Sequence, residues 1–203
     1  MRFGILLFAM ITFTMQGQER KGFFQLSGPK KTWVLFHPFK AEIAFQISKE
    51  TNFVADSIAK SHLLDGDKAG GQVDAFRHGY WMARLRQEIG ESAAASLGRA
   101  HEKENYLMFK KGSLEDGVLP DKISSDMDLW NNNIGLSLIT QGSKTSKNGL
   151  IYRIINAIHQ GKMRIIKKDK KGNFLTCKGK RIDPKTLLGK WRNNKCLIPS
   201  NEI

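Results

Sequence analysis

An acid, a base and a large aromatic side chain stand at helical spacing in one short stretch of the chain: Asp74, His78 and Trp81. Successive residues of an α-helix are about 100° apart, so these three share one face, which continues into Leu85. Arg77 flanks that face. Because an aliphatic stripe faces the core of a protein, we expect Asp74 and His78 to be buried with it. Buried ionisable groups must be paired or act as ligands, so their function depends on what lies opposite them.

A second predicted helix, over residues 92–110, also carries polar groups on its apolar side. His101 lies on the apolar face of this helix. Glu104 at i+3 is closer to His101 than Glu102 is, so helical geometry favours Glu104 as its partner.

The helix predicted over residues 124–140 repeats the arrangement. Asp128, Asn132 and Gly135 share one face, and Asn131 lies at its edge. Three consecutive asparagines oppose helix propensity, so another interaction must compensate for them. The three predicted helices therefore each direct polar groups toward a shared interior.

Three sequence blocks resemble an uncharacterised bacterial domain family: Asp-Ala-Phe-Arg-His-Gly-Tyr-Trp from Asp74, Ala-His-Glu around His101, and Met-Asp-Leu-Trp-Asn-Asn around Asp128. The pattern of that family is Asp-Ala-Phe-Arg-His-Ala-Tyr-Trp, then His-Glu, then Met-Asp-Leu-His-Asn-Asn. Gly79 stands where the family has Ala. Trp130 stands where a His is common, so a catalytic role of that His would be missing from this chain. The family has no assigned activity, and the resemblance implies none.

The residue types fit a metal-dependent hydrolase. Histidine nitrogens and carboxylate oxygens bind zinc or a similar ion, which lowers the pKa of a bound water and polarises an ester or phosphoryl oxygen. The general base is Glu102, which the family pattern includes, or Glu104. No tight motif such as His-Glu-x-x-His accompanies these residues. This interpretation predicts a metal site at Asp74, His78, His101 and Asp128, catalytic roles for His78, His101, Glu102 and Asp128, and substrate contacts from Arg77, Trp81, Asn131 and Asn132.

Two other interpretations stay open. In a metal-free hydrolase, Asp74 or Asp128 holds a histidine tautomer and that histidine activates water. Secreted bacterial phospholipases A2 have a similar Arg-His-Asp helix, but Gly79 and Phe76 here replace its calcium-linked Asp and its cysteine. Alternatively, the polar groups form a satisfied hydrogen-bonded network that fixes the helix packing, as in a non-enzymatic cell-envelope protein.

The N-terminal segment predicts export. Arg2 precedes an apolar run over residues 3–15, which is too short to span a bilayer as a helix of about 20 residues. The run fits a secretory signal peptide over residues 1–17, with an uncleaved membrane anchor as the alternative. We expect a periplasmic or secreted protein. Cys177 and Cys196 can form a disulfide in such a compartment or remain free thiols.

The positive charge is concentrated near the C-terminus. The formal net charge is +14, and residues 162–195 hold thirteen Lys or Arg against two acids. This segment is either a solvated face or a binding surface for an anionic partner such as acidic lipid or polysaccharide. Nucleic acid is a weaker candidate, because only Phe174 and Trp191 supply aromatic stacking there.

The hydrophobic periodicity predicts a mainly α fold, a bundle of about five helices with a small C-terminal β-hairpin. The predicted strands are residues 163–166 and 173–177. The domain organisation follows from these elements and from the composition: signal peptide 1–17, N-terminal extension 18–37, helical domain 38–161, and basic hairpin and tail 162–203. The predicted helices cover residues 39–60, 72–89, 92–110, 124–140 and 148–160.

Overall fold

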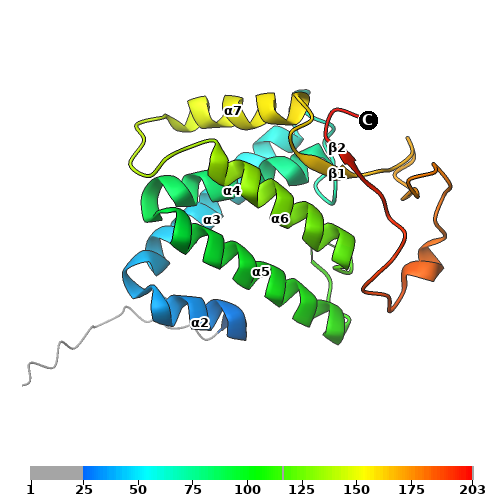
Figure 1. Cartoon of the computed structure of the whole chain (residues 1–203), viewed down its shortest axis with the longest axis horizontal. Helices are drawn as coiled ribbons and strands as arrows, with labels where there is room; N and C mark the ends of the chain where they lie inside the picture. Colours follow the sequence, from blue (N-terminus) through cyan, green and yellow to red (C-terminus); the bar gives the residue numbers. More distant parts are fainter. Residues whose placement is uncertain (1–24, 116, 203) are drawn as a thin grey trace, which may run out of the picture.

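The computed structural model describes residues 25–115 and 117–202 and confirms a mainly α fold with a small antiparallel sheet (Figure 1). The predicted signal peptide and the first part of the predicted extension lie outside these residues. Within the described part, no helix is both long and apolar enough to cross a membrane. The α-helices there are α2 (Gly28–Phe36), α3 (Pro38–Ala59), α4 (Gln72–Ile89), α5 (Glu91–Lys111), α6 (Lys122–Ser137) and α7 (Lys147–His159), and the strands are β1 (Arg164–Ile166) and β2 (Leu197–Pro199).

Helix α4 is the centre of the bundle. It packs against α3, α5, α6, α7 and β1, and Figure 1 shows it between α7 and α5. Two apolar clusters meet on it. One includes Phe76, Tyr80 and Ile154, and the other includes Trp33 and Leu85. Because neighbours cover α4 on most sides, its polar residues are buried together with its apolar ones.

The loop before α4 sets the position of the start of that helix. The carboxylate of Asp65 accepts hydrogen bonds from the backbone N–H groups of Gln72 (2.7 Å) and Val73 (3.3 Å), which satisfies helix-end donors. A Cβ atom on Gly71 would lie 2.4 Å from the Cβ of Asp67, so the loop can fold onto the helix end only with glycine there. The backbone N–H of Gly70 then donates to Asp74 Oδ2 at 2.8 Å. The loop therefore orients the first acid of the polar face.

Helices α4 and α6 approach each other at two glycines. A Cβ atom on Gly135 would lie 2.2 Å from the carbonyl oxygen of Gly79, which no side chain allows. His78 precedes Gly79, and Asn132 lies one turn before Gly135. The close crossing thus brings the polar faces of the two helices together.

Helix α6 begins earlier than the predicted Ser124 or Ser125. Asp121 is its N-cap: the Asp121 side chain accepts from Ser124 N at 2.9 Å, and the Ser124 hydroxyl accepts from Asp121 N at 3.0 Å. Helix α3 is continuous from Pro38 to Ala59, and Thr51 is buried within it.

The N-terminal extension contains helix α2, which lies outside the predicted helices. The hydroxyl of Ser27 caps this helix. The side chain of Trp33, also on α2, is buried against α5. The indole N–H of Trp33 donates to Ala93 O at 3.0 Å and to Ser96 Oγ at 2.9 Å. Helix α2 therefore belongs to the helical bundle.

The pairing of the C-terminal strands differs from the predicted hairpin. Strand β1 pairs with β2, with Ile165 opposite Ile198. The predicted turn does form, because Gly172 N donates to Asp169 O at 2.9 Å. The segment after it forms isolated bridges, Lys168 with Phe174 and Leu175 with Arg181. A disulfide joins Cys196, just before β2, to Cys177, with a Cα–Cα distance of 4.9 Å.

Candidate functional site

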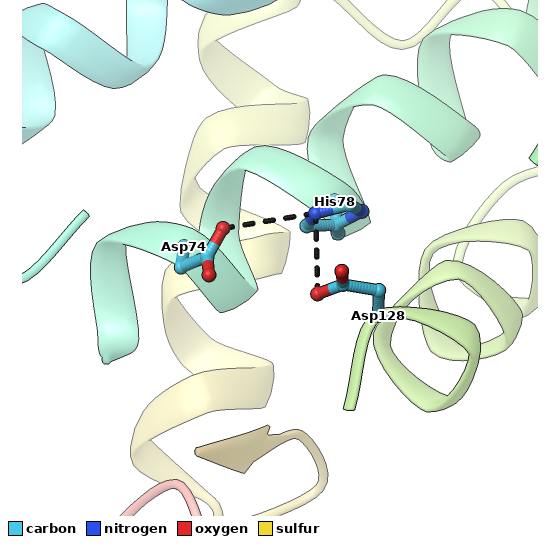
Figure 2. A group of neighbouring side chains, drawn as sticks. All are labelled: Asp74, His78 and Asp128. Atoms are coloured by element: carbon cyan, nitrogen blue, oxygen red, sulfur yellow. Dashed lines mark ion pairs between the residues drawn. The ribbon is translucent and has the colours of Figure 1, made fainter. Parts of the chain in front are cut away.

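Asp74, His78 and Asp128 converge where α4 and α6 face each other (Figure 2). The Nε2 atom of His78 lies 3.2 Å from Asp128 Oδ1 and 3.6 Å from Asp74 Oδ1. One ligand atom from each residue lies within 4.8 Å of the other two. The three residues are only 7, 3 and 4 % exposed, in that order. The i, i+4 spacing on α4 accounts for the first pair, and the glycine crossing brings in the third residue.

Asn132 defines the protonation of His78. Its side-chain oxygen lies 3.2 Å from His78 Nδ1. An amide oxygen only accepts hydrogen bonds, so Nδ1 carries the proton and the lone pair of Nε2 points toward the carboxylates. Burial, and secondarily the positive charge of Arg77, lowers the pKa of His78 to about 4. His78 is therefore neutral at neutral pH.

Asp128 is buried opposite that lone pair without a hydrogen-bond donor. Its Oδ1 atom has no hydrogen-bond partner, although it lies 3.2 Å from His78 Nε2. Burial, followed by repulsion from Asp74 and other nearby acids, raises the pKa of Asp128 well above its ordinary value. Two acceptor atoms that face each other at this distance need a positive species between them, either a proton or a cation.

Arg77 neutralises part of the acidic charge. Its Nη2 atom donates to Asp74 Oδ1 at 2.7 Å and lies 3.4 Å from His78 Nε2. The guanidinium therefore occupies one side of the site, next to both Asp74 and His78.

His101 lies close to His78 but outside the group of ligand atoms. The two ring centroids are 6.0 Å apart. The Nε2 atom of His101 pairs with Glu115 at 3.0 Å, and its Nδ1 atom lies 3.6 Å from Glu104. Burial lowers the pKa of His101, but the two carboxylates outweigh burial and raise it to about 9. His101 is thus a fixed cation, and the described structure does not bring it into the predicted metal site.

Glu102 and Glu104 face different surroundings. Glu104 pairs with His101 and Lys30, whereas Glu102 is buried and neither of its oxygens has a hydrogen-bond partner. Burial raises the pKa of Glu102 to about 7, and the charge of His101 and the nearby Ser125 oppose this shift only in part. The preference of helical geometry for Glu104 as the partner of His101 is therefore observed, while Glu102 is the acid that titrates near neutrality.

Two of the predicted substrate contacts have other partners. The amide of Asn131 bonds both backbone groups of Arg164, accepting from N at 2.9 Å and donating to O at 2.9 Å. The indole N–H of Trp81 donates to Ser48 Oγ at 3.0 Å, and its ring meets His101 edge-on at 5.6 Å. Asn131 therefore fastens strand β1 to α6, and Trp81 packs behind the site.

A pocket of about 40 Å³ opens beside the site. Its walls include Asp74, Arg77 and Asp128, together with Phe174 and Lys195 from the C-terminal segment. His78 lies behind the two carboxylates. A molecule entering this pocket would therefore meet the acids first.

A second hollow, of about 250 Å³, adjoins the first. The two share Lys68 and Arg77 in their linings, and Asn52 and Asp56 of α3 form another side of the larger one. Together they give room for a larger group beside the carboxylates.

Two residues of this region carry no signal in the sequence. Glu115 pairs with His101 from the irregular loop after α5, where no periodic pattern indicates a direction. Lys195 lines the pocket and pairs with Asp121 at 2.6 Å, although it looked like one more cation in a basic segment. Only the tertiary structure distinguishes either residue from its neighbours.

Buried polar atoms without partners gather in this part of the described structure. Seven buried side-chain nitrogen or oxygen atoms have no hydrogen-bond partner, and six of them belong to α5 and α6 next to the site. These six are His101 Nδ1, both carboxylate oxygens of Glu102, Asn105 Oδ1, Asp128 Oδ1 and Asn132 Nδ2. Such atoms are rare in folded proteins, and their concentration in one place requires a functional or ligand-based explanation.

Comparison with known proteins gives a family but no activity. Residues 31–162 match the family described as a domain of unknown function (DUF6973). No curated protein and no solved structure matches the chain. The match covers α3 to α7 and contains the whole Asp74–His78–Asp128 group. The chain therefore belongs to the DUF6973 family of uncharacterised domains.

Proposed function

We propose that this protein is a hydrolase that cleaves an ester or phosphodiester bond in the pocket beside Asp74 and Asp128. The observation that carries the proposal is the neutral, orientated His78, whose Nε2 faces Asp128 at 3.2 Å directly behind the pocket wall. A histidine held in one tautomer with its lone pair toward a carboxylate is equipped to accept a proton.

The proposed hydrolysis follows from the positions of the acids and of His78 around the pocket. A water molecule in the pocket is held by Asp74 and Asp128, and its oxygen attacks the carbonyl carbon or the phosphorus. Its proton passes to the Asp128–His78 pair and from there to the leaving oxygen as the scissile bond breaks. Glu102, with its pKa near 7, is a second proton acceptor near the site. The positive charges of Arg77 and His101 stabilise the negative charge that develops in the transition state.

The unpartnered atoms argue against a purely structural network. A network kept for stability should have all its polar groups paired, because each buried unpaired group costs free energy. Here Glu102, Asp128 and Asn132 each leave buried atoms unpaired. This pattern supports a site that interacts with a substrate or ion.

The test is hydrolysis of two chromogenic substrates, a nitrophenyl acetate ester and a bis-nitrophenyl phosphate diester. His78→Gln and Asp128→Asn should each lower kcat/KM by about 100-fold or more on the substrate that is cleaved. His159→Gln, at an exposed position, is the matched control and should keep full activity. Circular dichroism verifies that each variant is folded. Folded His78→Gln and Asp128→Asn proteins with full activity, or a wild-type chain inactive on both substrates, would contradict the proposal.

A second candidate role, binding to an anionic surface, is favoured by the exposed cations of the C-terminal segment. Nine of its thirteen Lys and Arg residues are exposed: Lys162, Lys170, Lys171, Lys178, Lys180, Arg181, Lys185, Lys190 and Arg192. Sedimentation with vesicles containing acidic lipid should show binding that weakens as salt rises from about 0.05 to 0.5 M, since salt screens exposed charges. Neutral vesicles are the control. Binding that does not depend on salt would exclude this electrostatic role.

We also propose that the protein is exported to the periplasm or secreted. The apolar run over residues 3–15 supports this, and so does the disulfide between Cys177 and Cys196, because disulfides persist in oxidising compartments. Mass spectrometry of the protein from its native cells should show a chain that begins near residue 18. A cytosolic chain that retains its first residues would rule out export by a cleaved signal.

A further inference from the structure

We propose that Asp74, His78 and Asp128 form a binding site for one divalent transition-metal ion of the zinc class. This inference deepens the proposed function and rests on the same site being functional rather than structural. With an ion bound, His78 Nε2 and Asp128 Oδ1 would act as ligands, and Glu102 would accept the proton of the water in their place. Its test measures binding rather than turnover, so either proposal can fail without the other.

Two of the three distances between the ligand atoms are close to those of a coordination sphere, and all three atoms lie within 4.8 Å of one another. An ion held tetrahedrally at about 2.0–2.1 Å from each ligand places those ligands about 3.3 Å apart. The two measured distances from His78 Nε2 are 3.2 Å to Asp128 Oδ1 and 3.6 Å to Asp74 Oδ1. Small side-chain adjustments would therefore bring all three atoms within bonding distance of one ion.

The chemical types of the three ligand atoms favour one class of metal ion. One imidazole nitrogen with two carboxylate oxygens suits zinc and its first-row neighbours, whereas magnesium and calcium prefer oxygen ligands alone. Hydrogen bonds to the other polar atoms of two ligands also fix their orientation. Asn132 accepts from His78 Nδ1, and Gly70 N donates to Asp74 Oδ2. The other atoms of the two side chains, His78 Nε2 and Asp74 Oδ1, both lie beside Arg77 Nη2, at the position that an ion would take. Such supporting hydrogen bonds are characteristic of metal ligands.

Asp128 provides the independent observation. It is 4 % exposed, and its Oδ1 atom has no hydrogen-bond partner while it faces the lone pair of His78 Nε2. A cation between the two atoms would satisfy both at once. A shared proton is the alternative occupant, and the experiment below separates the two.

Arg77 is the cation that an ion must displace. Its Nη2 atom now donates to Asp74 Oδ1, one of the three ligand atoms. A bound ion would take over that oxygen and repel the guanidinium. Removing the charge at position 77 should therefore strengthen metal binding, which distinguishes a true site at Asp74 from a fortuitous one elsewhere.

The remaining coordination position faces the pocket. Asp74 and Asp128 both line the hollow of about 40 Å³, so an ion between them would reach solvent on that side. A catalytic zinc site has three protein ligands and an open position for water. The geometry therefore suits a reactive ion better than a closed structural one.

The experiment is calorimetric titration of the chelator-treated, full-length chain with zinc chloride. The wild-type chain should bind one ion per molecule, and His78→Gln and Asp128→Asn should each weaken binding by about 100-fold or more, since each removes a ligand. Arg77→Gln should bind more tightly than wild type. Asp126→Asn is the matched control, because this α6 carboxylate pairs with Lys122 and is not one of the three ligands. Magnesium and calcium should bind far more weakly than zinc.

Cobalt(II) provides a readout that does not require folded variants. The wild-type chain loaded with cobalt should show the visible absorption of a tetrahedral ion, and zinc should displace it. Absence of zinc and cobalt binding would overturn the metal site and leave a shared proton between Asp128 and His78. In that case hydrolysis that survives chelator treatment would still uphold the proposed function, whereas zinc binding without hydrolysis would uphold only the metal site.

Discussion

His78 and His101 show how strongly the partner decides the state of a side chain. Their rings are 6.0 Å apart and both are largely buried, yet the pKa is about 4 for His78 and about 9 for His101. Two carboxylates lie within 3.6 Å of each ring, but His78 is more deeply buried and also lies next to the guanidinium of Arg77. At neutral pH the site therefore combines a neutral acceptor with a permanent positive charge.

The charge of His101 makes stability fall as the solution becomes alkaline. Its pKa rises from 6.5 to about 9 on folding, so its contribution is complete below pH 6.5 and is lost as pH rises to about 9. By linkage, the free energy of unfolding should drop by roughly 3 kcal/mol at most across that range. Glu102 lowers the free energy of unfolding in a different range. Its pKa is raised from 4.5 to about 7, so its contribution is lost as pH rises between those values and adds little above pH 7. Urea denaturation of chelator-treated protein at several pH values measures the slope.

The variant His101→Gln assigns that slope to one residue. Glutamine keeps polar contacts but cannot bind a proton, so the decline between pH 7 and 9 should disappear. A decline of unchanged size in this variant would mean that other groups cause it.

At the scale of the elements, the crossing of α4 and α6 holds the site together. Gly135→Ala would place a methyl group against the backbone oxygen of Gly79, where only 2.2 Å is available. The helices must separate, so we expect a loss of about 3 kcal/mol in unfolding free energy, as for overpacked cores, and a loss of zinc binding. Asn133→Ala, on the exposed face of α6, should be neutral or slightly stabilising because alanine favours helix. Thermal and urea unfolding compare the two, and equal stability would refute the close-packing argument.

Periodicity made the helices easier to predict than their partners. Helix α4 has the predicted bounds, because glycine and a clear apolar period mark both ends. Helix α2 was missed because it is short and contains Gly28 and Pro29, and the pairing of β1 with β2 joins segments far apart in the sequence. Turn chemistry and periodicity are local signals, so they contain no information about such pairings.

The same difference between local signals and long-range contacts decides which parts of the candidate site could be predicted. Asp74 and His78 could be paired from the sequence because i, i+4 positions on one helix must be neighbours. Asp128 followed from the same reasoning on α6. His101 pairs with Glu115 from a loop, and Asn131 bonds the backbone of strand β1. Only the packing of the chain defines where this loop and this strand lie.

At the scale of the whole molecule, the basic C-terminal segment has two parts with different roles. Nine of its cations are exposed, but Lys195 is buried between Asp121 and the ring of Phe174, and Lys168 binds Asp67 of the loop before α4. Lys195 of this segment therefore lines the pocket, while the exposed cations face solvent. The disulfide at Cys196 fixes the chain next to Lys195.

Loss of Lys195 should weaken the whole fold. The side chains of Lys195 and Asp121 are 4 % and 6 % exposed, so Lys195→Met leaves a buried carboxylate without its counterion. We expect a loss of about 3 kcal/mol in the free energy of unfolding. Lys190→Met, an exposed neighbour in the same segment, should change it by less than about 0.5 kcal/mol.

The double variant Asp121→Asn/Lys195→Met checks this cause. Asparagine still caps α6 but carries no charge, so it should recover part of the lost stability. A single Lys195→Met variant as stable as wild type would show that the ion pair contributes nothing.

Consecutive asparagines on α6 link the histidine to the opposite wall of the pocket. Asn132 holds the ring of His78, while Asn131, rotated by about 100° around the helix, holds the backbone of β1, whose end lines the pocket. A one-residue insertion or deletion between Asp128 and Gly135 would turn one contact away from its target whichever way the helix adjusted. The spacing of these positions along α6 should therefore be the same in other members of the DUF6973 family.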